Sequence, residues 1–117
     1  MTTPTPILPD DLPATIRDFL AAHVTRDADT ALGCFSPDAV VVDDGRTFRG
    51  SSEVLDFLGN AGAEFRYTTE LVGAERVDEQ RWVAHHHLEG DFPGGEADLA
   101  YRFTLVGDRI TELVIAG

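Results

Sequence analysis

The sequence has few basic residues. It contains 9 lysine and arginine residues against 21 aspartate and glutamate residues, which gives a net charge of −12 at pH 7. A surface of this sign is repelled by the phosphates of nucleic acids and by anionic membrane lipids. We therefore expect neither a nucleic acid nor a membrane as a partner.

Cysteine, long apolar runs and targeting signals are equally scarce. The single cysteine, Cys34, cannot form an intramolecular disulfide, and its apolar neighbours Leu32 and Phe35 indicate a small core residue rather than a nucleophile. No apolar run approaches the roughly 18 residues that a membrane-spanning helix needs. Residues 1–13 contain no basic residue and no signal-like apolar stretch, so a cytoplasmic location is expected.

The length of 117 residues, with 43% hydrophobic residues, fits one domain with its own core. Four prolines among residues 1–13 are typical of an extended segment. We therefore divide the chain into a flexible arm rich in proline and threonine, residues 1–10, and a single domain, residues 11–117.

Hydrophobic periodicity predicts three helices in the first half of the chain. Apolar residues recur at helical spacing over residues 12–24, with Asp11 as the expected N-cap. A short helix is expected over residues 27–35, capped by Asp27 or Asp29 and ended by Ser36-Pro37-Asp38. The third begins at Ser51 or Ser52 and stops at Gly59-Asn60-Ala61-Gly62.

The segments outside these three helices are predicted to be mainly β-strands. A β-branched run over residues 39–43 is followed by an Asp44-Gly45 turn and a short extended stretch. Helices first and long antiparallel strands afterwards predict an α+β layered fold. The later strands are expected at residues 66–77 with a break near Gly73, 80–89, 97–106 and, after a Gly107-Asp108 turn, 109–116.

Two segments carry a resemblance to a known family: CFSPDAVVVDDGRTFRG, residues 34–50, and YRFTLVGDRITELVI, residues 101–115. With the element order, they resemble the nuclear-transport-factor-2-like superfamily, in particular its SnoaL-like polyketide cyclases and ketosteroid isomerase. This resemblance implies a curved, antiparallel (mixed) β-sheet wrapped around three N-terminal helices, a cone with an internal pocket, and a homodimer. Because the fold hosts many reactions, it does not identify one.

Asp43 is the first candidate for chemistry. The resemblance to ketosteroid isomerase matches it to the general-base aspartate at the end of the first strand. Burial in an apolar cavity raises the pKa of an aspartate above about 3.9 and makes it a better base. The alternative is a solvated strand end. By the same resemblance, Phe19 and Leu99 replace the oxyanion-hole tyrosine and the protonated acid, which argues against ketosteroid isomerisation.

The run His85-His86-His87 lies in a predicted strand, where successive side chains point to opposite faces. The resemblance turns the face of Trp82 and His86 into the cavity, so His86 is a candidate acid or base beside Asp43. His85 and His87 have the spacing of a metal pair but no third ligand that we can name, so we predict no metal. Glu112 is a second carboxylate candidate if its strand face looks inward.

The resulting hypothesis is a cofactor-free enzyme acting by proton transfer on a small hydrophobic molecule, as an isomerase, cyclase or dehydratase. Its catalytic residues would be Asp43, His86 and Glu112. The alternatives are a non-catalytic ligand-binding or dimerisation module and a protein-interaction adaptor. The residues expected to line the pocket are Phe19, Phe57, Trp82, Leu99, Tyr101, Phe103 and Val114.

Overall fold

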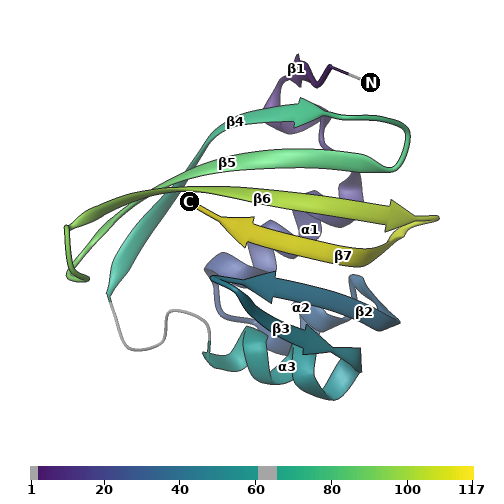
Figure 1. Ribbon diagram of the computed structural model, residues 1–117, viewed down its shortest axis with the longest axis horizontal. Helices are drawn as coiled ribbons and strands as arrows, with labels where there is room; N and C mark the ends of the chain where they lie inside the picture. Colours follow the sequence, from purple (N-terminus) through teal and green to yellow (C-terminus); the bar gives the residue numbers. More distant parts are fainter. Residues whose placement is uncertain (1–2, 61–65) are drawn as a thin grey trace.

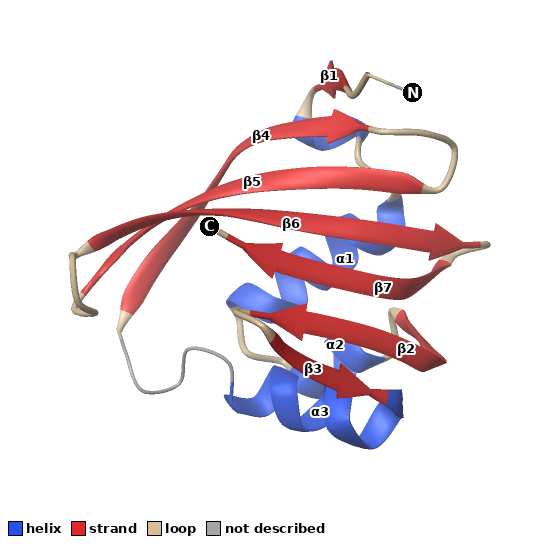
Figure 2. Cartoon of the chain, viewed as in Figure 1, coloured by secondary structure: helices blue, strands red, loops and turns tan. Residues whose placement is uncertain are grey.

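The computed structural model describes residues 3–60 and 66–117. Helices cover one face of a curved, mixed sheet that does not close into a barrel, as the resemblance predicts (Figures 1 and 2). Within the described residues the strand order is β1-β4-β5-β6-β7-β2-β3. The elements are β1 (Thr5–Ile7), a 3₁₀ turn η1 (Pro9–Asp11), α1 (Ala14–Val24), α2 (Ala28–Leu32), β2 (Phe35–Asp43), β3 (Arg46–Arg49), α3 (Gly50–Asn60), β4 (Tyr67–Arg76), β5 (Arg81–Gly90), β6 (Glu96–Val106) and β7 (Arg109–Ala116).

The segment expected to be a flexible arm joins the fold instead. Its residues Thr5–Ile7 pair antiparallel with Ala74–Arg76 of β4 and form the edge strand β1. Proline lacks the N–H of a ladder donor, so an edge strand is where a proline such as Pro6 can be tolerated. The 3₁₀ turn then takes up Asp11, and α1 starts after Pro13 rather than at an Asp11 cap.

The second helix is shorter than predicted. Asp27 caps it as expected, since its carboxylate accepts a hydrogen bond of 3.2 Å from the Thr30 N–H. The helix ends at Leu32, however, and Phe35 already begins β2. Pro37 restricts its predecessor to extended backbone, and the strand register shifts between Phe35 and Val40, so the proline lies in an irregular stretch of strand.

The later strands agree with the prediction to within one residue at each described end, and the break near Gly73 is a register shift between Leu71 and Gly73. The third helix is described from Gly50 to Asn60. Gly59 and Asn60, the first half of the predicted stop Gly59-Asn60-Ala61-Gly62, are therefore still helical, and Ala61 and Gly62 lie outside the described residues. β2 lies parallel to β7, which makes the sheet mixed. The register shifts in β4 and β2 mark bulges or irregularities, and β-bulges bend strands and increase their twist.

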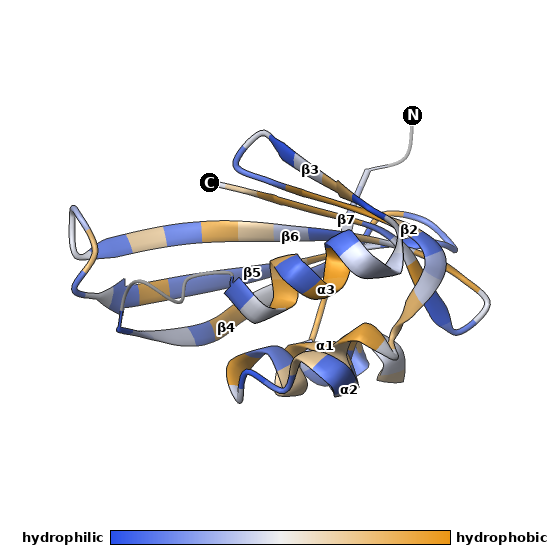
Figure 3. Cartoon of the chain, turned by 90° about the horizontal axis from the view of Figure 1, so that it is seen from below, coloured by the Kyte–Doolittle hydropathy of each residue, from blue (hydrophilic) through white to orange (hydrophobic). Residues whose placement is uncertain are grey.

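The core fills only one end of the space between helices and sheet. Phe19, Phe103 and Leu113 are essentially inaccessible, and the rings of Phe19 and Phe103 meet edge to face at 5.7 Å. Figure 3 shows the helices on the same side of the sheet and β4 to β6 reaching beyond them. At this other end the side chains leave two pockets. No helix in the described part of the chain is long and apolar enough to cross a membrane.

A packing prediction follows from Gly90, which lies opposite Tyr67 where β4 and β5 pair. A Cβ atom there would overlap the Arg66 carbonyl oxygen and the Tyr67 Cβ atom. We expect Gly90→Ala to lower the free energy of unfolding by about 1–3 kcal/mol, measured by urea denaturation. Gly59→Ala is the control, because a Cβ atom there meets nothing within 4 Å. It should stabilise the helix by up to ~1 kcal/mol. Equal effects of the two substitutions would contradict the predicted overlap.

Candidate functional site

Two adjoining pockets occupy the hollow end of the fold. The larger has a volume of about 420 Å³ and the smaller about 280 Å³. They share the side chains of His23, Tyr67 and Tyr101. The larger is otherwise lined by Asp43, Asp44, Phe57, Leu88, Phe92, Pro93, Ala97, Leu99 and Ile115, and the smaller by Leu20, Val24, Arg26, Thr68, Thr69 and His86.

Asp43 lines the larger pocket from the end of β2. The chain reverses directly after it through Asp44 and Gly45, both with positive φ (51° and 78°), so the half-buried Asp43 side chain is fixed beside the turn. Burial raises the pKa of Asp43, the Asp44 carboxylate adds to the rise, and Arg46 opposes it. Asp43 is therefore a stronger base than a solvated aspartate, while remaining ionisable.

His23 and Tyr101 stand in the same pocket as Asp43. The His23 ring stacks on Phe19 at 5.4 Å, one helical turn away in α1. Burial lowers the pKa of His23, and the charge of Arg26 lowers it further, so the imidazole is neutral at pH 7. Burial, with Tyr67 and Asp43 nearby, raises the pKa of Tyr101, which keeps its hydroxyl protonated. Beside Asp44 and Tyr67, the pocket thus combines the Asp43 carboxylate, as a base, with the neutral His23 ring and Tyr101 hydroxyl, which can donate hydrogen bonds.

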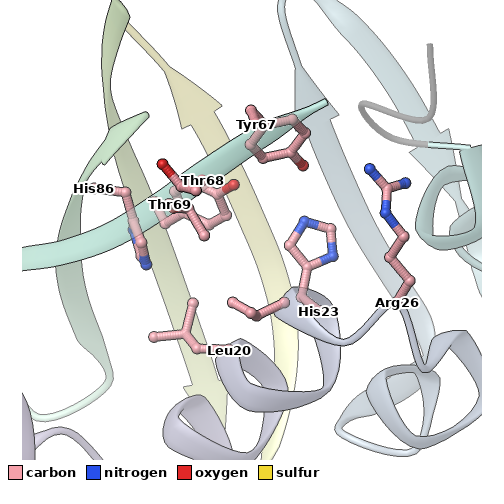
Figure 4. A pocket seen from close by; sticks show the side chains of 9 residues that line it. Leu20, His23, Arg26, Tyr67, Thr68, Thr69 and His86 are labelled. Carbon is pink, nitrogen blue, oxygen red and sulfur yellow. The ribbon is translucent and has the colours of Figure 1, made fainter. Parts of the chain in front are cut away.

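His86 lines the smaller pocket and not the larger, so the structure does not bring it together with Asp43 as expected. Its side chain points inward from β5 (Figure 4). The ring centroids of His86 and Tyr101 are 4.6 Å apart. The residue is only 5% exposed, and burial lowers its pKa to about 4. Its Nδ1 atom has no hydrogen-bond partner among the residues that the structure describes.

His85 and His87 lie on the opposite face of β5, so the alternation predicted for the three histidines is confirmed. His85 Nε2 contacts the Glu75 carboxylate. His87 Nδ1 contacts Asp98 at 2.7 Å, and its Nε2 lies 3.4 Å from Glu89. The two histidines have separate carboxylate partners, so they do not form one His-x-His pair of ligands.

Several residues predicted for the site lie elsewhere. Glu112 is exposed, because the register shift between Leu105 and Thr104 leaves Ile110, Leu113 and Ile115 as the inward positions of β7. Val114, two residues on from Glu112, is likewise on the outer face and half-buried. Phe19, Phe103 and Trp82 belong to the packed core or its margin. Phe57, Leu99 and Tyr101 line the larger pocket as predicted.

Two residues that line both pockets, His23 and Tyr67, are not among the residues predicted for the site. His23 is four residues after the buried Phe19, a spacing that places both on one face of a helix. That signal was present, but a helix-end histidine at the core margin has the same pattern. Tyr67 lies at the start of β4, where residue alternation could not show which face looks inward.

Residues 16–113 match the family described as the SnoaL-like domain. A Sinorhizobium meliloti protein designated a candidate polyketide cyclase is 30% identical, with a TM-score of 0.85 over 94% of this chain and 100% of that one. Comparison with curated protein sequences gave no match.

Two further solved structures share the fold at lower identity. A Catenulispora acidiphila protein with a ketosteroid isomerase-like fold, in complex with trimethylamine, is 17% identical, with a TM-score of 0.77 over 90% of this chain and 85% of that one. TerC co-crystallised with polyporic acid is 18% identical, with a TM-score of 0.74 over 87% of each chain.

Proposed function

This chain belongs to the SnoaL-like domain family, and we propose that it binds a small, largely apolar molecule in the larger pocket and transfers a proton on it. One observation carries the proposal: Asp43, His23 and Tyr101 line the same pocket, whose other walls are mainly apolar. An apolar pocket with a few convergent polar groups and shifted pKa values is the usual form of a site for small-molecule chemistry.

The chemistry that suits these groups is abstraction of a proton next to a carbonyl. The Asp43 carboxylate accepts the proton as the C–H bond breaks, and the electron pair moves onto the carbonyl oxygen to give an enolate. The protonated Tyr101 hydroxyl and the neutral His23 ring are available as hydrogen-bond donors to that oxygen. In a β,γ-unsaturated ketone the enolate is conjugated, and returning the proton from Asp43 to the γ-carbon completes an isomerisation. In a compound with a second carbonyl, attack of the enolate carbon forms the new C–C bond, and the resulting alkoxide takes the proton from Asp43, which completes a cyclisation.

Tyr101 can replace the hydrogen-bond donor whose absence at Phe19 argued against enolate chemistry. Phe19, at the position where the resemblance expects a tyrosine, lacks a hydroxyl and is buried in the core. Tyr101 supplies a phenol to the same pocket from β6 instead. The Sinorhizobium meliloti relative, a candidate polyketide cyclase, supports a carbonyl substrate of this kind. The homodimer and the cytoplasmic location stay predictions.

The test is solvent deuterium exchange into 2-tetralone, an apolar ketone with acidic α-protons, followed by proton NMR in D₂O. We expect exchange faster than in buffer alone, with a rate that rises with pH as Asp43 ionises. Because burial raises the pKa of Asp43 above 3.8, the exchange rate should increase at a higher pH than it would with a solvated aspartate as the base. It levels off once the carboxylate is ionised, since the raised pKa of Tyr101 keeps the donor protonated.

Exchange at the buffer rate, with 2-tetralone shown by chemical-shift changes to be bound, would contradict proton transfer. That result would favour the alternative, a non-catalytic ligand-binding domain using the same pocket.

A further inference from the structure

The larger pocket is lined by a second carboxylate, Asp44, which the proposed proton transfer does not use. We propose that this pocket binds a ligand with an alkylammonium group, a tertiary or quaternary amine, that pairs with Asp44 beside the aromatic side chains of the wall. The inference deepens the proposed function by naming a class of substrate. It rests on that function in one respect, because the larger pocket is taken as the ligand site.

The wall of the larger pocket carries negative charge. Asp43 and Asp44 both line it, and its described lining residues include no lysine or arginine. The His23 imidazole on the same wall is neutral, because burial lowers its pKa. The charge of Arg46 opposes the effect of Asp44 on the pKa of Asp43, but it is the smaller of the two influences. The pocket therefore attracts a cation and repels an anion.

Aromatic rings make up much of the remaining wall. The larger pocket is lined by four of them, from Phe57, Tyr67, Phe92 and Tyr101. The face of an aromatic ring attracts a cation, and several rings around an apolar space are a common way for proteins to bind quaternary amines. Alkyl groups on the nitrogen suit such a wall, whereas a bare ammonium or a metal ion would lose its hydration there.

The position of Arg26 indicates where the ammonium lies. Arg26 lines the smaller pocket, and its guanidinium carbon is 5.8 Å from the ring centroid of Tyr67. This fixed positive charge disfavours a second cation in the smaller pocket. The two carboxylates lie in the larger pocket, at the turn after β2. The ammonium is therefore placed at the Asp44 side of the larger pocket.

The proposed reaction does not change this charge balance. As the proton moves from carbon to Asp43, the negative charge that Asp43 loses appears on the enolate oxygen, and Asp44 keeps its own. The pocket thus holds two negative charges before and after the step, and a ligand ammonium offsets one of them throughout. The substrate class is a small ketone that carries a tertiary or quaternary amine, and Asp44 is a specificity-determining residue.

The experiment compares choline with 3,3-dimethylbutan-1-ol, which has nearly the same shape but carbon in place of the charged nitrogen. Dissociation constants are measured by NMR titration of the wild-type protein at pH 7 and low salt, with the amide signals of Asp44 and Tyr101 as the local readout. We expect choline to bind about fivefold to tenfold more tightly than the alcohol. The anion of similar shape, 3,3-dimethylbutanoate, should bind more weakly than the alcohol.

The matched variants are Asp44→Asn and Asp108→Asn. Asp44 has a φ of 51°, in the left-handed region that asparagine adopts readily, so the first variant removes the charge and keeps the turn. Asp108 is exposed in the β6–β7 turn and lines neither pocket, so the second removes one charge elsewhere. The preference for choline should fall at least about threefold in Asp44→Asn and change less than about 1.5-fold in Asp108→Asn.

The Asp108→Asn control separates the pocket from the net charge of −12, which attracts cations over the whole surface. Equal binding of choline and the alcohol by the wild type would overturn the inference. A preference that Asp44→Asn keeps, or that both variants lose equally, would do the same, as would tighter binding of the anion. If Asp44→Asn does not fold, Asp44→Gly takes its place, because glycine adopts a positive φ without strain.

The two proposals fail separately. Loss of 2-tetralone exchange with the choline preference intact would reject the reaction and leave the ammonium site. Exchange of 2-tetralone without a choline preference would reject the ammonium site and leave the reaction.

Discussion

Asp43→Asn is expected to slow deuterium exchange into 2-tetralone by about 10²–10⁴-fold in kcat/KM, the usual contribution of a positioned general base. Asparagine keeps the size and hydrogen-bonding shape of the side chain at the end of β2, but its amide cannot accept the proton. Because binding in the larger pocket rests mainly on apolar contacts, the affinity for 2-tetralone should change little. The loss should therefore appear in kcat rather than in KM.

Asp38→Asn is the matched control for this prediction. Asp38 lies on the same strand and is exposed, and its Oδ1 atom accepts a hydrogen bond of 3.0 Å from the Ser36 hydroxyl, which an asparagine can also accept. This variant should exchange 2-tetralone at the wild-type rate. A loss of less than fivefold in Asp43→Asn, or an equal loss in both variants, would show that Asp43 is not the base.

The free energy of unfolding shows whether Asp43→Asn loses activity because the base is missing or because the protein is unfolded. The pKa of Asp43 is higher in the folded chain than its ordinary value, so the ionised carboxylate disfavours folding at neutral pH. Removing that charge should leave the protein at least as stable as the wild type. Circular dichroism and urea denaturation at pH 7 check this directly, and an unfolded variant would require repeating the assay with Asp43→Ser.

The sheet was predictable because its signals are local. Alternating apolar residues, the Asp44-Gly45 turn and the Gly107-Asp108 turn define strands and hairpins without knowledge of distant contacts, and each agrees with the structure. The errors lie where distant contacts decide. Thr5–Ile7 is a strand only because β4 offers an unpaired edge, and Phe35 begins β2 rather than ending α2 because it pairs with Ile110 of β7.

The site was predictable only in part, for a similar reason. Alternation along β5 separated His86 from His85 and His87, and the resemblance turned its face inward and brought Asp43 to a pocket. Glu112 shares a face with Val114 as alternation predicts, but that face looks outward: a bulge in the β6–β7 pairing changes which residues face inward, and no local pattern reveals a bulge. That Asp43 meets His23 and Tyr101, while His86 stands in the adjoining pocket, depends on the packing of α1 across the sheet.

Acid should destabilise the wild type far more than His86→Phe. The pKa of His86 is about 4 in the folded chain against 6.5 ordinarily, because burial disfavours the charged ring. Between these two values the unfolded chain binds a proton that the folded chain does not, so stability falls as the pH is lowered through this window. By pH 4 the difference amounts to about 3 kcal/mol, at 1.36 kcal/mol for each pKa unit.

The comparison with the variant isolates this one group. The pKa of His23 is lowered too and that of Asp43 is raised, but both residues are present in both proteins and their contributions largely cancel in the difference. Urea denaturation at pH 7, 6, 5 and 4, followed by the fluorescence of Trp82, gives the two curves. They should diverge progressively below pH 6.5, with His86→Phe the more stable protein at pH 4; parallel curves would contradict the prediction.

Urea denaturation at pH 7 also measures what it costs the fold to bury the imidazole of His86. At pH 7 the wild type buries an Nδ1 atom that has no hydrogen-bond partner among residues 3–60 and 66–117. Phenylalanine removes the cost of burying it and preserves the ring contact with Tyr101. We therefore expect His86→Phe to be no less stable than the wild type even at neutral pH.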